Sequence, residues 1–358
     1  MPSVSQRIKR VQQPHGGYLP CKAWTKEAIQ DQYVLSDSEN LHGSLVGMAV
    51  DKYLVRYMLT EDAKTAFQIS IKGANLNLMA DKADALVKQI KGLDDTSIKC
   101  ACKLSGFDVC ARANPLAYVP IEEINPDKNT INNIRIMVKR TLNLFKHHGP
   151  IIKSGFTFKG GYSNIVDRGD ADYLTKSALW DLKVARSPIG SKETLQILMY
   201  YIMGLRAYKK IFTELKYLGI YNPRLNIVYA YPIDKISEAV INEVSEKVIC
   251  YSSEDQMKKI NQIDFTTQDY TIIDKYEVQY IDVKEAVVLL KVSKTKVYSL
   301  IKMGSIDGTK VKNKYQITRQ SVEAYIEKKR RQMKISIGIS ISITIIYLIV
   351  TIIYMNKL

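Results

Sequence analysis

The 358-residue sequence lacks several features that would identify a secreted or nucleotide-driven protein. Its first residues, MPSVSQRIKRVQQPHGG, contain no apolar run, so we expect no secretory signal. It has only five cysteines, an odd number in a large chain, which does not indicate a disulfide framework. There is no GxGxxG or Walker A motif and no Ser–His–Asp arrangement. Nothing therefore indicates a nucleotide-driven motor.

Positive charge is in excess. The chain has 52 Lys and Arg against 36 Asp and Glu, a formal net charge of +16. Hydrophobic residues make up 46% and charged residues 25%, which is ordinary for a globular protein of about two domains. Residues 275–334 alone hold 15 Lys and Arg and 6 Asp and Glu. This surplus favours a polyanionic partner, either nucleic acid or anionic lipid.

Changes in composition divide the chain into five parts. We expect an irregular arm at residues 1–40, an α/β domain at 41–251 and a polar linker at 252–279. A small DNA-binding domain at 280–330 and an apolar tail at 335–355 follow.

The α/β domain alternates between helical and extended hydrophobic patterns. Apolar residues at helical spacing predict helices at 42–59, 81–91, 132–147, 192–209 and 237–248. Short apolar runs bounded by turn residues predict strands at 151–158, 163–166, 171–174, 178–185 and 225–231. This order predicts a mixed sheet flanked by helices.

Acidic residues gather around one predicted hairpin. If the turn is at residues 176–177, Asp172 faces Asp181 and Asp170 faces Lys183. A three-residue turn would shift this register, so the pairing depends on the turn. Adjacent carboxylates repel each other, and a divalent cation with oxygen ligands, Mg²⁺ or Mn²⁺, resolves the repulsion. Lys183 would then help to activate a water and stabilise charge on a phosphate.

These residues resemble the PD-(D/E)xK nuclease superfamily, in particular its RecB-like branch. The shared motifs are Gly-x-x-Asp from Gly169 to Asp172, Trp-Asp-Leu-Lys at 180–183, and Gln-x-x-x-Tyr from Gln196 to Tyr200. The resemblance implies a restriction-endonuclease-like core with three kinds of site residue. Asp172 and Asp181 would be metal ligands, Lys183 the catalytic lysine, and Gln196 and Tyr200 supporting residues.

The same branch carries an acidic residue on an early helix, often after Gly-x-x-x. The segment from Gly47 to Asp51 matches that pattern, so the resemblance implies Asp51 as a third metal ligand. The intervening stretch of about 120 residues is longer than expected for the branch.

Residues 280–330 have the pattern of a helix-turn-helix. Asp282 and Ser293 are suited to cap two short helices joined by a tight turn, and Gly304 to end the second. The segment resembles the excisionase-type, MerR-like winged helix-turn-helix family. That resemblance implies a recognition helix and a basic wing that contact DNA, through Lys294, Thr295, Lys296 and Tyr298 and through Lys310, Lys312 and Lys314. The alternative is a protein-interaction module with a solvated basic face.

Residues 335–355 are 21 residues without a charge. As a helix they would be about 31 Å long, close to the thickness of the bilayer hydrocarbon. Basic residues precede the segment, so we expect a single-pass C-terminal transmembrane helix with the rest of the chain at the cytoplasmic face. The alternative is a buried hydrophobic helix or strand.

Together these features predict a metal-dependent nuclease that hydrolyses DNA phosphodiester bonds and carries a DNA-binding domain and a membrane anchor. The main alternative is a membrane-tethered DNA-binding regulator whose nuclease-like fold is inert. A third hypothesis makes the core a binding module for RNA or a protein, with the charged hairpin as an ordinary solvated turn.

Overall fold

The structure is a computed structural model. It describes residues 1–112, 118, 120–252, 280–306, 308–311, 314–319, 321–323, 325–326 and 329. The chain divides into two units, Met1–Tyr276 and Glu277–Leu358, and each is described by itself. The predicted linker at 252–279 lies almost wholly outside the described residues.

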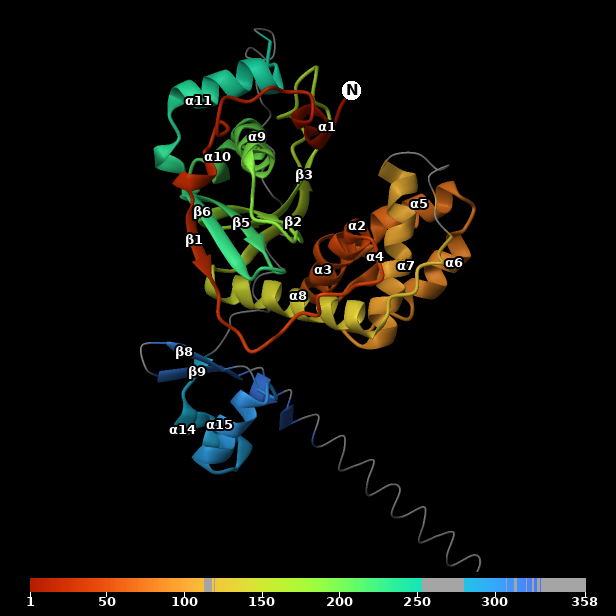
Figure 1. The fold of residues 1–358 in the computed structure, drawn as a ribbon, viewed down its shortest axis with the longest axis vertical. Coiled ribbons are helices and arrows are strands. Elements are labelled where there is room, and N and C mark those ends of the chain that lie inside the picture. The colour runs from red at the N-terminus through yellow and green to blue at the C-terminus, as the bar shows by residue number, and fades with distance from the viewer. Residues whose placement is uncertain are drawn as a thin grey trace, which may run out of the picture. The chain divides into compact units, whose positions relative to one another are not determined.

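A six-stranded mixed sheet forms the centre of the first unit (Figure 1). Its order is β1-β6-β5-β4-β3-β2, and only β4 and β5 pair in parallel. The strands are β1 (Thr25–Ala28), β2 (Ile151–Thr157), β3 (Asp170–Thr175), β4 (Ala178–Leu182), β5 (Tyr217–Asn222) and β6 (Ile227–Pro232). The sheet and its flanking helices confirm the predicted α/β class.

The hairpin between β3 and β4 has the predicted register. Tyr173 pairs with Trp180 and Leu174 with Leu179, which is the pairing expected for a turn at residues 176–177. A shift of one residue would have sent every side chain of the strand to the opposite face. The register therefore decides which residues reach the candidate site.

Helices fill the rest of the first unit. Those before β2 are α1 (Val4–Ile8), α2 (Gly43–Gly47), η2 (Met48–Leu54), α3 (Val55–Thr60), α4 (Ala63–Ala66), α5 (Gln68–Leu76), α6 (Ala80–Val87), α7 (Asp95–Arg112) and α8 (Lys128–His147). Those after β4 are α9 (Ser191–Ala207), α10 (Lys209–Phe212), α11 (Glu238–Glu243) and η5 (Val244–Ile249). The predicted helix at 42–59 is the continuous run α2–η2–α3, in which η2 is a π-helix.

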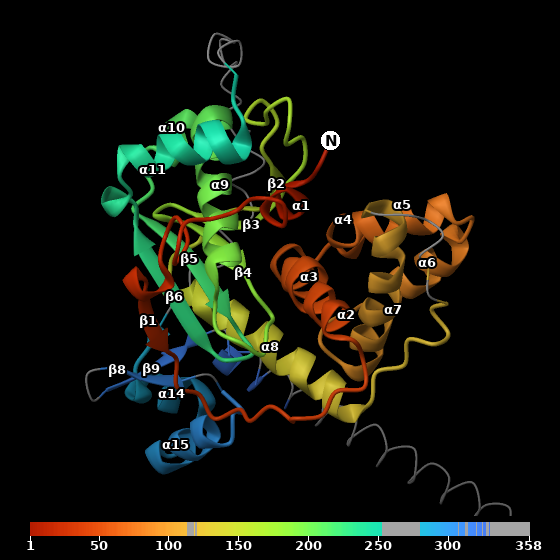
Figure 2. The same ribbon diagram turned by 45° about the horizontal axis from the view of Figure 1, so that its top comes forward.

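Each face of the sheet has its own hydrophobic core. Leu179 packs with α9 on one face, whereas Trp180 packs on the other against Phe145 of α8, with ring centroids 6.1 Å apart. In both views α8 runs from the sheet to the group of helices that contains α2, α3 and α7 (Figures 1 and 2). Alternation along β4 therefore directs Asp181, like Leu179, towards the side of α9.

Residues 1–40 differ from the irregular arm that we expected. They include α1, whose Val4 is fully buried, and β1, which pairs with β6 at the sheet edge. The sequence of β1 is Thr-Lys-Glu-Ala and all four residues are exposed, so the strand has no buried face. It is held by backbone pairing with β6 and by the Thr25 hydroxyl, which donates to the Ala230 carbonyl at 3.0 Å. The short strand β5 was also not predicted, and residues 163–166 do not form the expected strand.

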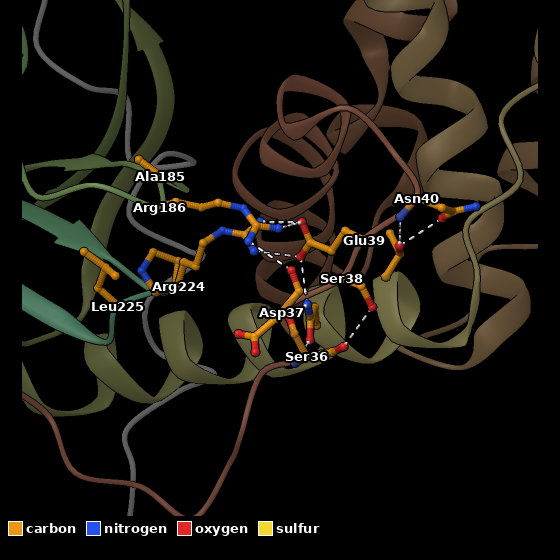
Figure 3. A network of polar contacts seen from close by, with 12 residues as sticks. Ser36, Asp37, Ser38, Glu39, Asn40, Ala185, Arg186, Arg224 and Leu225 are labelled. Atoms are coloured by element: carbon orange, nitrogen blue, oxygen red, sulfur yellow. Dashed lines mark hydrogen bonds and ion pairs between the residues drawn. The ribbon is translucent and has the colours of Figure 1, made fainter.

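A buried ion pair holds the segment that leads into α2 (Figure 3). Arg224 contacts both carboxylate oxygens of Glu39, at 2.7 and 3.0 Å, and both side chains are more than nine-tenths buried. Asn133 of α8 donates to the same carboxylate at 2.9 Å, and Arg186 lies 3.6 Å from it. The segment is thereby tied to α8, to the turn after β5 and to the loop after Lys183.

The second unit has the predicted helix-turn-helix. Asp282 caps α14 (Val283–Leu290) and Ser293 caps α15 (Lys294–Lys302), which confirms both predicted caps. A three-stranded sheet of order β7-β9-β8 completes it, from β7 (Tyr280–Ile281), β8 (Gly308–Val311) and β9 (Lys314–Thr318). Buried side chains, among them Ala286, Val297 and Ile317, form its core.

The predicted membrane anchor requires correction. Residues 335–355, to which the prediction refers, lie outside the described residues. No helix in the described ranges is both long and apolar enough to cross a membrane. The 20-residue helix α8, for example, carries Arg135, Lys139 and Arg140 along its length, and such charges are costly in hydrocarbon. The finding contradicts the predicted localisation, and the membrane is withdrawn as a partner.

Glu39→Ala should lower the free energy of unfolding by about 3–5 kcal/mol, because it leaves the Arg224 guanidinium buried without its carboxylate. Urea denaturation checks this value. The double variant Glu39→Ala/Arg224→Met should lose less unfolding free energy than the two single variants lose in sum, since each single change already breaks the pair. Additive losses would show that the pair is not coupled.

Candidate functional site

Three carboxylates lie near the middle of the sheet. Asp170 and Asp172 belong to β3 and Asp181 to β4. Asp172 and Asp181 are 2% and 3% exposed, so both are withdrawn from water. The Asp172 carboxylate accepts a hydrogen bond from the backbone N–H of Leu182 at 2.8 Å, which fixes it against β4. The predicted hairpin thus brings the two aspartates of the motif together.

Lys183, Gln196 and Tyr200 form a continuous polar series beside Asp181. The Lys183 ammonium lies 2.7 Å from an Asp181 oxygen and donates to Gln196 Oε1 at 2.7 Å. Gln196 Nε2 in turn donates to the Tyr200 hydroxyl at 2.9 Å. Gln196 and Tyr200 are four residues apart on α9, so they share the helix face that meets the strand.

Close packing explains why the first residue of the Gly-x-x-Asp motif is a glycine. A Cβ atom at Gly169 would lie 2.8 Å from Val4 Cγ2 and 3.0 Å from Tyr200 Cε1. Only glycine allows α1 and the Tyr200 ring to approach the start of β3 this closely. Tyr162 reinforces the position by donating its hydroxyl to the Gly169 carbonyl at 2.6 Å.

Asp51 comes to the same cluster from η2. The Tyr173 hydroxyl donates to the Asp51 carbonyl at 2.9 Å and so anchors η2 to β3. Asp51 is 7% exposed, and its Oδ1 has no hydrogen-bond partner within the described part of the chain. The structure therefore places Asp51 with the hairpin acids although about 120 residues separate them.

Lys52, which sequence reasoning missed, lies among these carboxylates. Its ammonium forms an ion pair with Asp172 and lies 3.4 Å from Asp51 and 3.6 Å from Asp170. In sequence it looks like an ordinary solvated lysine, but in the fold it belongs to the π-helical turn η2. The wider π-helical turn rotates successive side chains less than an α-helix does, so residues 51 and 52 can both face the sheet.

Two arginines add further positive charge. Arg56 Nη2 lies 3.8 Å from Asp172, and Arg112 Nη1 lies 3.4 Å from Asp170. Arg56 packs over Gly155, where φ is +58° and a Cβ would lie 2.4 Å from the Arg56 guanidinium. Glycine is thus required at residue 155 both by the backbone and by the arginine.

Burial and charge separate the acidities of the carboxyl groups. Burial and the neighbouring Asp172 raise the pKa of Asp51 to about 7. Burial raises the pKa of Asp181 to about 6, with Lys183 opposing the rise and Asp172 adding to it. Burial would also raise the pKa of Asp170, but Lys52 and the two arginines together lower it to about 2. Two of the carboxyl groups are therefore costly to ionise in the folded protein.

The donor atoms of this cluster suit a hard divalent cation. Asp51, Asp172 and Asp181 supply carboxylate oxygens, which Mg²⁺ and Mn²⁺ prefer, and Asp51 Oδ1 is buried and unpartnered. No group of three His, Cys, Asp or Glu residues in the described ranges is arranged to hold a metal as it stands. As the cluster stands, the ammonium of Lys52 forms ion pairs with Asp51, Asp170 and Asp172.

The predicted DNA-contacting residues lie on the exposed face of the second unit. Lys294, Thr295, Lys296 and Tyr298 are exposed on α15, opposite its buried Val297, Leu300 and Ile301. The Tyr298 ring packs against Tyr315 of β9, with centroids 5.4 Å apart, so the helix and the wing are joined. Lys310 and Lys314 are exposed on the wing strands, and Lys312 lies outside the described residues.

Comparison with known proteins identifies the second unit. A family model described as a helix-turn-helix domain matches residues 280–330. The chain thus carries a DNA-binding helix-turn-helix domain of the excisionase-like kind. No curated protein and no solved structure matches the chain significantly.

Asp51→Asn should gain stability relative to the natural chain as pH rises from 5 to 8. The native pKa of Asp51 is about 7, against about 4 in an unfolded chain. The native state therefore binds more protons in this window, and the contribution of Asp51 to stability falls as pH rises. The neutral amide avoids this fall, so its relative gain should be on the order of 2 kcal/mol by urea unfolding. The exposed Asp84→Asn is the control, and an equal pH response of both variants would contradict the assignment.

Proposed function

We propose that the first unit is a metal-dependent nuclease of the PD-(D/E)xK type that hydrolyses DNA phosphodiester bonds. The observation that carries the proposal is the convergence of the hairpin aspartates with the series Lys183–Gln196–Tyr200. The motif order implies the same set of residues, which supports the proposal. The contacts among these residues are an observation separate from the motif, because they follow from the strand register and from the face of α9 that meets the sheet.

Asp172 and Asp181, with Asp51, would supply the ligands of a Mg²⁺ or Mn²⁺ ion. Such an ion, when bound, supplies a Lewis acid and lowers the pKa of a water. The buried backbone bond from Leu182 to Asp172 keeps one ligand fixed. Gln196 and Tyr200 hold the lysine and orient it toward the aspartates.

Lys183 would act as a charged donor rather than as a base. Burial lowers the pKa of this lysine, but Asp181 and Asp172 outweigh that effect and raise it. The ammonium therefore stays protonated at neutral pH. It is held between Asp181 and Gln196, where it can donate to a water or to a phosphate oxygen on which charge develops.

The helix-turn-helix domain would bring DNA to the chain. Its exposed basic residues on α15 and on the wing are suited to phosphate contacts, which supply most of the affinity of such domains. This domain is the reason for which DNA is proposed as the substrate.

A second candidate is a DNA-binding regulator with an inert nuclease-like core. The position of Lys52 favours it, because an internal ammonium already neutralises the carboxylates that a metal would need. The two candidates differ in whether divalent cations produce cleavage.

Asp181→Ala and Lys183→Ala should each lower metal-dependent cleavage of linear DNA by about 100-fold or more, because each removes a ligand or a charge used at the transition state. The full chain is incubated with Mg²⁺, Mn²⁺ or EDTA, and products are resolved on gels. Lys192→Ala, which changes an exposed lysine of the same helix α9, should cleave normally. Cleavage that persists in EDTA, or in both site variants, would contradict the nuclease proposal.

The double variant Lys310→Ala/Lys314→Ala should bind DNA with a weaker salt dependence. Each lost phosphate contact reduces the slope of log K against log salt by about 0.9, so a decrease of about two is expected. Fluorescence anisotropy at several salt concentrations measures the slope. Lys284→Ala on α14 serves as a control for the loss of charge alone, and an unchanged slope in the double variant would show that the wing does not contact phosphates.

A further inference from the structure

We propose that Lys52 holds the cation position of the carboxylate cluster in the resting protein, and that a divalent metal binds there only by displacing its ammonium. The inference rests on the proposed function only for the identity of the incoming cation. It makes Lys52 the residue that sets the metal affinity of the site.

The contacts of Lys52 resemble those of a bound cation. One ammonium reaches Asp51, Asp170 and Asp172, which come from two elements distant in the sequence. The positive charge of Lys52 thus lies where a metal ion would offset the charge of these carboxylates.

Internal cations already offset much of the negative charge of the cluster. Asp51, Asp170, Asp172 and Asp181 form ion pairs with Lys52, Arg56, Arg112 and Lys183, and Arg112 also pairs with Asp108. A divalent ion added to this set would be repelled by the cations as well as attracted by the carboxylates. Displacement of one cation leaves more negative charge unopposed and so favours the metal.

Lys52 is the cation best able to leave. Its side chain is 22% exposed and ends a flexible four-carbon stem, whereas that of Arg56 is 11% exposed and is packed over Gly155. Arg112 is held by a second ion pair with Asp108 at 2.7 Å, and Lys183 by Gln196. After Lys52 leaves, Asp51 Oδ1, which has no hydrogen-bond partner within the described ranges, is available as a ligand.

The test is direct metal binding without DNA. Calorimetric titration of the full chain with Mn²⁺ should give a dissociation constant at least about tenfold lower for Lys52→Met than for the natural chain, since the competing ammonium is gone. Lys64→Met, which changes an exposed lysine of α4, should leave the affinity unchanged. Equal or weaker Mn²⁺ binding by Lys52→Met would overturn the inference.

A second measurement on the natural chain does not require the variant to fold. Amine labelling of Lys52 by a succinimidyl ester, followed by peptide mass spectrometry, should become faster in saturating Mn²⁺, with Lys64 as the internal reference. An unchanged rate would overturn the inference. The two proposals fail separately. If Lys52→Met binds Mn²⁺ more tightly but the natural chain does not cleave DNA, only the nuclease proposal is contradicted. If the natural chain cleaves DNA but Lys52→Met does not bind Mn²⁺ more tightly, only this inference is contradicted.

Discussion

The cost of burying Asp51, Asp172 and Asp181 beside the half-buried Asp170 is the constraint on which the first unit depends. Water cannot solvate Asp172 or Asp181, which are 2% and 3% exposed, so cations within the fold must offset their charge. The helical run that carries Lys52 and Arg56 provides two of those cations, and α7 provides Arg112. The helical group is thereby bound to the sheet by charge as well as by packing.

The hairpin was the part of the site that could be predicted from sequence. Its two-residue turn and the strict alternation of a strand determine which residues of β3 and β4 face each other, and the observed pairs Tyr173–Trp180 and Leu174–Leu179 agree. The motif resemblance implied that Gln196 and Tyr200 belong to the site, and helical spacing puts them on one face of α9. The place of Asp51 in the cluster was expected from a motif resemblance and not from any local pattern.

Other elements could not be predicted because they leave no local signal. Lys52 looks like any lysine on a helix, and its partner Asp172 is 120 positions away in the sequence. Strand β1 consists of four exposed residues and depends on backbone pairing with β6. The buried pair of Glu39 and Arg224 joins residues 185 positions apart. In each case the determining partner is distant in sequence.

The central claim is that the carboxylate cluster accepts a divalent cation. A crystal structure of the full chain grown with Mn²⁺, with anomalous data, tests it most directly. The account predicts an anomalous peak within ligand distance of Asp172 and Asp181, at about 2.0–2.3 Å from their oxygens, with the Lys52 ammonium moved away from Asp172. The absence of a peak at saturating Mn²⁺, with Lys52 still paired to Asp172, would contradict it.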